Sequence, residues 1–408
     1  MKTVSENQKQ FAQWTLEYQK KKEEADRLFA RISTFRILTF LIGAAALIIG
    51  ITEKEKSYSV FLTVAGVVFL IGFVVLVKWH NVVADRQSLL TEKWEVCNRY
   101  CSRFTDGWRK FPETGAGYMT EDDCVAADID LLGENSLYQM ISVCHTDKGK
   151  QLFARHLTER SVSETEREQR CGAIAELAQK PEFAVEFETA GRRMESEREK
   201  FDAEAFEDFC QDPAQGKLPG FAHVLRIVLP ILEIAGLIAF LCGAVSYGYP
   251  LVGFLILLVV SWLTRFLTDS VIQPVCYASN VSGAYEDMLS LIAGQDFASG
   301  ILAQMRQQAG GTAGAVKAYH KLKAISQAYN ISFNPLVHQI LCGFLLWDYQ
   351  LAAIVSKWKK KYGAQVAGCS DMLAELEDLM SFSVLGMVRD TGDSTIDYKQ
   401  DQVYLEGT

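Results

Sequence analysis

The 408-residue chain is long enough for two or three domains. Its hydrophobic residues, 49% of the total, are gathered into blocks, and we expect the ten cysteines to be reduced thiols because no cleavable signal peptide precedes them. The net charge of −9 argues against a large nonspecific nucleic-acid surface, because neutralising phosphates requires clustered Lys and Arg.

The first two apolar blocks predict a transmembrane hairpin. Residues 37–51 and 60–77 carry no charged side chain, and each block is near the roughly 20 residues that cross a bilayer. Only the short segment TEKEKSYS separates them, which suits a tight connection between antiparallel helices. We therefore predict a charged helical arm over 1–36, a transmembrane hairpin over 37–78 and a helical linker over 79–125.

The next region, 126–217, predicts the first half of a helical cytoplasmic domain. Ser163 and Glu166 have the spacing of a capping box, so a helix should begin there and continue through Leu177. We expect His145 and His156 at helix surfaces. Cys144 precedes His145 directly, but neighbours on a helix project differently, so adjacency alone does not predict a catalytic dyad.

A second transmembrane hairpin is predicted over 224–268. It contains Glu233 and Arg265, which are costly in hydrocarbon unless they are paired or hydrated. Counted from Gly248, they lie 15 and 17 residues away, a difference in depth of roughly 3 Å at 1.5 Å per residue. The sequence therefore favours an intramembrane ion pair, while separate snorkelling of each side chain and a proton or ion pathway remain alternatives.

Beyond this hairpin, 279–384 predicts the second helical half, followed by a linker over 385–408 with an alternating, strand-like pattern. Breaks are expected at Gly310 and at Pro335, where the preceding residue resists the α region. Glu375 and Glu377 are expected on a solvated helix.

One dense basic cluster lies in the second half. A solvated helix end is the favoured interpretation of this cluster, with a phosphate contact and an anionic-lipid contact as the alternatives. Its members surround Trp358 and are Lys357, Lys359, Lys360 and Lys361.

Two stretches resemble a known family in their order and spacing. The first includes Leu131 to Gly133, Ser136 to Gln139, Thr146, Gly149, Leu152, Arg170 and Ala173 to Leu177. The second includes Asn334 to His338, Leu346 to Asp348, Trp358 and Ala374 to Ser381. Together they resemble the core, or lever, region of MutS-type DNA mismatch-repair ATPases, in the form found in membrane-bound members. Arg170 and Glu176 are interpreted as polar anchors, and Gly149 as a site of close packing or a turn.

The resemblance implies a mainly α integral membrane protein with two transmembrane helical hairpins and a MutS-core-like helical cytoplasmic domain. It also implies a homodimer that binds DNA, with ATP and Mg²⁺ bound by an ATPase domain following residue 408. The chain contains no phosphate loop of the form GxxxxGK[ST], so we assign it no catalytic, cofactor-binding or metal residues, and enzyme activity is expected only with that further domain. The alternative function is a membrane scaffold or partner-binding protein without a DNA role.

No stretch of the sequence resembles the mismatch-reading domain of the family. Phe111 and Glu113 superficially match the family's Phe-x-Glu wedge, but they lie in a Gly-rich segment, and a loop is the better interpretation.

Basic residues predict the orientation in the membrane. Six Lys and Arg residues between Lys20 and Arg36 precede the first hairpin, whereas its loop has only Lys54 and Lys56. By the positive-inside rule, both termini and the core are cytoplasmic. The sequence thus predicts a multi-pass protein of the cell (inner) membrane.

Overall fold

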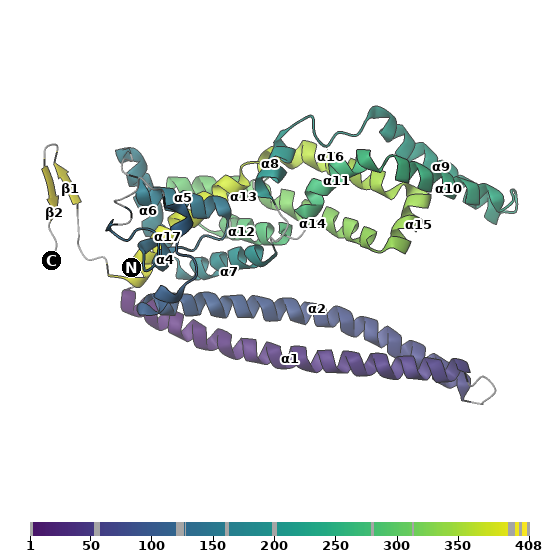
Figure 1. Ribbon diagram of the computed structural model, residues 1–408, viewed down its shortest axis with the longest axis horizontal. Coiled ribbons are helices and arrows are strands. Elements are labelled where there is room, and N and C mark those ends of the chain that lie inside the picture. Colours follow the sequence, from purple (N-terminus) through teal and green to yellow (C-terminus); the bar gives the residue numbers. More distant parts are fainter. Residues whose placement is uncertain are drawn as a thin grey trace. The chain divides into compact units, whose positions relative to one another are not determined.

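The computed structural model is mainly helical, as predicted, and its chain forms two compact units (Figure 1). Unit 1 comprises Met1–Pro112 and Leu385–Thr408, and unit 2 comprises Glu113–Val384. The structure describes residues 3–52, 58–119, 126, 128–159, 163–197, 202–278, 281–311, 314–390, 396–399 and 402–405.

Unit 1 is built on two long antiparallel helices, α1 (Val4–Thr52) and α2 (Ser59–Arg103). The predicted arm and the first apolar block form one uninterrupted helix, because no Gly-Pro signal interrupts the sequence between them. In α2 the second apolar block likewise continues into the predicted linker, which then forms the 3-10 helix η1 (Asp106–Lys110).

The contacts between α1 and α2 change in character along their length. Near the chain's first turns, the rings of Phe11 and Tyr100 stack with centroids 4.4 Å apart. In the apolar part, a Cβ atom at Gly66 would lie only 2.8 Å from the backbone nitrogen of Leu47, so glycine allows the two backbones to approach closely. Apolar side chains here face outward, as Val68 does with 60% of its surface exposed.

The remaining part of unit 1 comes from the end of the described chain. The last turn of α17 (Cys369–Val388) accepts a hydrogen bond at the carbonyl of Met387 from the Asn7 side chain, at 3.1 Å. Strands β1 (Ile396–Lys399) and β2 (Gln402–Leu405) form an antiparallel hairpin in which Ile396 pairs with Leu405. This hairpin falls in the segment with the strand-like pattern.

Unit 2 contains the two predicted halves of the helical domain and the second predicted hairpin. The predicted capping box is confirmed at its N-cap, since the Ser163 side chain accepts from the Glu166 N–H and α6 begins at Glu164. Its elements are η2 (Ala116–Tyr118), α4 (Leu137–Ile141), α5 (Asp147–Thr158), α6 (Glu164–Ala178), α7 (Pro181–Glu197), α8 (Ala203–Gln211), α9 (Gly220–Leu241), α10 (Gly248–Leu263), α11 (Arg265–Tyr277), α12 (Ser282–Gly294), α13 (Gly300–Gly310), α14 (Ala315–Asn330), η3 (Ile331–Phe333), α15 (Pro335–Leu345), α16 (Trp347–Val366) and most of α17.

Three helices, α1, α2 and α9, are long and apolar enough to cross a membrane. The number rises to five if each of two bent helix pairs counts as one span. In the first pair α10 meets α11 at a bend of 65°, and in the second α15 meets α16 at 82°. The described chain is therefore consistent with a membrane protein by helix length and composition.

Helix α15 falls within 279–384, the range predicted for the second half of the cytoplasmic core. It packs against the apolar helices α9 and α10, and Phe344 meets Phe254 of α10 with ring centroids 5.1 Å apart. Its Leu336 and Ile340 are exposed, with 66% and 45% of their surfaces accessible. Its 11 residues span only about 17 Å, too short to cross a bilayer alone.

Candidate functional site

The most buried polar cluster of unit 2 centres on Glu377 of α17. This side chain has no exposed surface, and its carboxylate accepts hydrogen bonds from the backbone N–H groups of His145 and Thr146 at 3.0 and 3.1 Å. The Thr146 hydroxyl donates to Oε2 at 2.5 Å. A Cβ atom at Gly149 would collide with this carboxylate, so the glycine permits the approach. Burial raises the pKa of Glu377, although His145 and these hydrogen bonds oppose the rise.

Asp378 is equally buried and binds a different set of partners. Its Oδ2 accepts a hydrogen bond from Arg170 of α6 at 2.5 Å and lies 2.9 Å from His156 Nδ1 of α5. One turn further along α17, the Ser381 hydroxyl accepts from the Val143 N–H at 3.1 Å. These side chains join α5 and α6 to a helix more than 200 residues away in sequence.

The two stretches that carry the family resemblance therefore meet in one cluster. Thr146 and Arg170 come from the first stretch, and Glu377 and Asp378 from the second. The predicted interpretation of Arg170 as a polar anchor and of Gly149 as a site of close packing agrees with these contacts. The resemblance itself stays a prediction.

Three expectations about this cluster are wrong. Glu377 was expected on a solvated helix but is 0% exposed, and His145 was expected at a helix surface but is 5% exposed. The side chain of His156 is also largely covered, at 14% exposure. For Glu377 the reason is that Leu376, Leu379 and other neighbours on α17 are buried too, so the helix presents no solvated stripe here. His145 precedes α5 and is not part of a helix.

His145 and Cys144 turn to different partners. The imidazole Nδ1 lies 2.9 Å from Glu195 Oε2, and the Cys144 Sγ lies 3.3 Å from the Ser381 hydroxyl. Loss of water disfavours ionised Glu195, but hydrogen bonds with His145 and Lys150 outweigh this and lower the pKa of Glu195 to about 2. Glu195 therefore binds both His145 and Lys150. Cys144 and His145 do not form a nucleophile and base in contact with each other.

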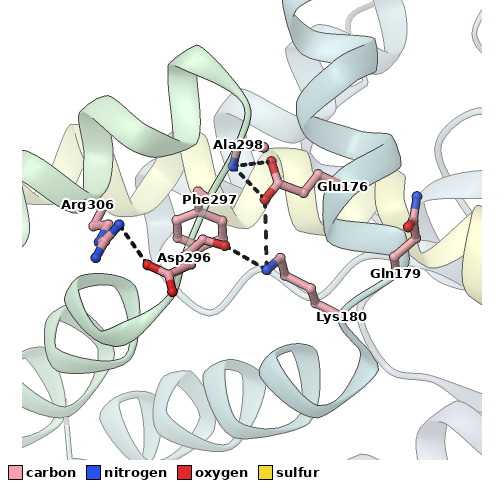
Figure 2. Close-up of a pocket in the computed structure, with 7 residues that line it drawn as sticks. All are labelled: Glu176, Gln179, Lys180, Asp296, Phe297, Ala298 and Arg306. Atoms are coloured by element: carbon pink, nitrogen blue, oxygen red, sulfur yellow. Dashed lines mark hydrogen bonds and ion pairs between the residues drawn. The ribbon is translucent and has the colours of Figure 1, made fainter.

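A second cluster of hydrogen bonds joins the end of α6 to the loop before α13, beside an open cavity of about 560 Å³ (Figure 2). The Glu176 carboxylate accepts hydrogen bonds from the N–H groups of Ala298 and Ser299 at 2.9 and 2.7 Å. Lys180 donates to the Asp296 carbonyl at 2.8 Å, and the Asp296 carboxylate pairs with Arg306 at 2.9 Å. Glu176 thus meets the N-terminus of α13, where N–H groups lack helical partners, which agrees with its predicted anchoring role.

Three side chains at the bend between α15 and α16 could hold a metal ion. His338 and Cys342 are one helical turn apart on α15, and Asp348 lies in the first turn of α16. Their ligand atoms lie within 4.8 Å of one another, and His338 Nε2 is 2.8 Å from Asp348 Oδ1 and 3.3 Å from Cys342 Sγ. Nitrogen, sulfur and oxygen ligands of this kind suit zinc. The same atoms also hydrogen-bond one another, which secures the bend at Leu346.

This cluster is not arranged as a catalytic triad. The thiol and the carboxylate both face Nε2 of His338, whereas a triad uses the two ring nitrogens separately. Sequence reasoning assigned no metal residues and missed the cluster. The available signal was a His and a Cys at helical spacing, His338 and Cys342, followed closely by Asp348.

The predicted ion pair between Glu233 and Arg265 is not among the contacts of the described residues. Arg265 instead pairs with Asp269, one turn along α11, at 3.1 Å. Glu233 is buried, and its carboxylate lies against Gly253 of α10. Gly253 precedes Arg265 by 12 residues, which corresponds to about 18 Å along a helix. The prediction failed because it centred the hairpin on Gly248, whereas Glu233 and Gly253 place the centre near residue 243.

Of the four lysines in the predicted cluster, one is buried and three are exposed. Lys359 is buried, and its ammonium donates to the carbonyls of Asp212 and Gln215 at 2.7 Å each. It therefore serves the fold and is not available to an external phosphate. Lys357, Lys360 and Lys361 are exposed on the surface of α16.

Phe111, which matches the family's wedge in the sequence, makes contacts inside unit 1. Phe111 is 9% exposed, and the guanidinium of Arg99 lies 4.4 Å from the centre of its ring. The ring therefore packs inside unit 1, as expected for a loop rather than for a projecting wedge.

No family model, curated protein or solved structure matches the chain.

Proposed function

We propose that this chain is the membrane anchor and helical lever of a MutS-like, mismatch-repair-type ATPase. Helices α1 and α2 form one transmembrane hairpin and α9 and α10 the other, with the core and both termini in the cytoplasm of a cell (inner) membrane protein. An ATPase module follows residue 408 and binds ATP and Mg²⁺. Its movement passes through α17 to both hairpins, and the assembly is a homodimer that contacts DNA.

The observation that carries this proposal is the position of α17. Its buried residues Glu377 and Asp378 hold α5 and α6 in unit 2. Its last turn belongs to unit 1, where Met387 bonds Asn7 of α1. A single helix of 20 residues therefore contacts both the core and the arm that leads into the first hairpin.

Exposed apolar side chains support the proposed spans. Ile231 and Leu232 of α9 have 60% and 63% of their surfaces accessible, and Leu251 of α10 has 52%. Contiguous apolar surfaces of this kind are rare on soluble proteins and mark contact with lipid or a partner. The basic residues before α1's apolar part support a cytoplasmic arm.

Hydrogen–deuterium exchange on the full-length protein in lipid nanodiscs tests the lever. With ATP and Mg²⁺, we expect amide protection to change in α17 and in the first turns of α1. The matched variant Asn7→Ala should keep the change in α17 and lose it in α1, because the hydrogen bond to Met387 is removed. Nucleotide-independent protection in both segments would contradict the proposal.

The alternative is a membrane scaffold that binds a partner without a DNA role. It is favoured by the exposed apolar side chains of α9 and α10, which suit contact with a partner as well as contact with lipid. Binding of the full-length protein to duplex and branched DNA, measured over a range of salt, separates the two. Affinity that falls with salt supports the DNA role, and no binding at any ionic strength supports the scaffold.

A further inference from the structure

Helices α14 and α16 enclose a groove of about 440 Å³ with an apolar floor and a basic margin. No acidic side chain is among the described residues that line it. The floor consists of Ala324, Ile325, Ala328, Leu351, Ile354, Trp358 and Tyr362, and the margin of Lys321, Lys357 and Lys361.

The positive charge of this margin is not neutralised within the described part of the chain. None of Lys321, Lys357 and Lys361 forms an ion pair there, and all three are exposed. The basic margin therefore differs from the predicted cluster, because it lacks the buried Lys359 and includes Lys321 of α14. Three cations gathered beside an apolar groove favour a ligand with an anionic group and a hydrocarbon chain.

The groove begins level with the proposed membrane boundary. Arg226, at the start of the apolar part of α9, exchanges hydrogen bonds with Gln350 of α16. Lys357 is seven residues beyond Gln350, about 10 Å along the helix, which places it near the outer edge of a polar headgroup layer roughly 5–8 Å thick.

The apolar end of the groove adjoins further exposed apolar side chains. Ala328 lies in the last turn of α14, just before Ile331 and Phe333, which have 45% and 71% of their surfaces accessible. Leu336 of α15 follows with 66%. Lys321 lies about two turns before Ala328 on α14, and Lys357 and Lys361 lie in the later part of α16. The groove therefore runs from an apolar surface towards a basic one.

We propose that this groove binds an anionic phospholipid, with an acyl chain along the floor and the phosphate among Lys321, Lys357 and Lys361. The inference rests on the proposed spans but not on the ATPase module. A DNA backbone fits less well, because it would leave the apolar floor, including Ile354 at 48% exposure, without a hydrocarbon partner.

Native mass spectrometry of the full chain in detergent tests this site. The protein is titrated with phosphatidylglycerol and with phosphatidylcholine, which share acyl chains and differ in net charge. We expect one bound phosphatidylglycerol in excess of phosphatidylcholine. The triple variant K321Q/K357Q/K361Q should bind it about 100-fold more weakly, since each lysine near an anionic surface contributes about a fivefold gain in affinity.

Two variants provide the matched comparisons. Lys360→Gln removes an exposed lysine of the same helix that does not line the groove and should leave the excess unchanged. Ala324→Trp fills the floor and should abolish the excess while all lysines remain. Circular dichroism confirms that each variant is folded before the lipid is counted.

The proposal is overturned if the triple variant retains phosphatidylglycerol as the original protein does. Displacement by millimolar inorganic phosphate, with no effect of Ala324→Trp, would identify a simple phosphate site instead. Displacement by duplex DNA at equal phosphate concentration would assign the lysines to nucleic acid. Loss of ATP-driven exchange in the lever experiment would leave this lipid result unaffected, so the two proposals fail independently.

Discussion

The cluster around α17 and the α1–α2 pair hold helices together by different means. In the core, Glu377 and Asp378 are fully buried and bond to groups from other helices. Between α1 and α2, glycines such as Gly66 bring backbones together, while apolar side chains face outward. Burial drives packing where water is the solvent, and close van der Waals contact replaces it in lipid. The two regions should therefore respond to opposite kinds of substitution.

The largest effect is expected for Glu377→Ala in the core. The change leaves the N–H groups of His145 and Thr146 and the Thr146 hydroxyl without an acceptor. The cost should be about 3 kcal/mol or more, since each buried donor left unpaired costs about 1–3 kcal/mol. Thermal unfolding of the detergent-solubilised protein, followed by circular dichroism, measures the loss. Glu375→Gln, two residues away and only partly buried, is the control, and equal losses in both variants would contradict the role of Glu377.

The next effect is expected for Gly66→Leu in the helix pair. Its Cβ would lie 2.7 Å from Leu47 Cγ and 3.0 Å from the Gly43 carbonyl, so the helices must separate, at a cost of about 1–3 kcal/mol. Gly72→Leu is the matched control, because the nearest atom to its Cβ is 3.9 Å away. Crosslinking between cysteines introduced on α1 and α2 reports the separation. Equal crosslinking in the two variants would show that close approach at Gly66 is unimportant.

A smaller effect, visible only in acid, is expected for Glu195→Gln. The pKa of Glu195 falls from 4.5 to about 2 on folding, so its contribution to stability is present above pH 4.5 and is lost as the pH falls towards 2. The variant should therefore show a shallower fall in melting temperature between these limits. His145 and Lys150 face the carboxylate and are kept unchanged. Parallel pH profiles of the two proteins would exclude this contribution.

The smallest effect is expected for Arg265→Gln. Its side chain is 66% exposed and, among the described residues, forms its ion pair with Asp269, so the loss should be about 0.5 kcal/mol or less. A buried pair with Glu233 would instead cost several kcal/mol when broken. Melting temperature in detergent distinguishes the two. A large loss that is restored by combining Glu233→Arg with Arg265→Glu would reinstate the intramembrane pair.

Features that depend on local sequence were predictable. Long apolar blocks predicted the apolar parts of α1, α2, α9 and α10, Ser163 predicted the start of α6, and Pro335 predicted the start of α15. These follow from the composition of a few adjacent residues, because capping groups and proline act within one turn.

Features that depend on distant partners were not predictable. Glu375 and Glu377 look alike in the sequence, yet only Glu377 meets Thr146, 231 residues away. Lys359 and Lys360 are neighbours, yet one is buried on the carbonyl groups of Asp212 and Gln215. Hydrogen-bond partners of this kind are set by the tertiary fold, which the spacing of charges along a chain does not encode.

The hydrogen bond from Asn7 to Met387 also constrains the order of events during synthesis. Its two ends are 380 residues apart, so at about 5–20 residues per second the ribosome needs roughly 20–80 s to deliver the second after the first. Under the proposed topology, α1 and α2 enter the bilayer during this interval. The beginning of the chain must therefore wait at the membrane surface, and the last turn of α17 joins a hairpin that is already inserted.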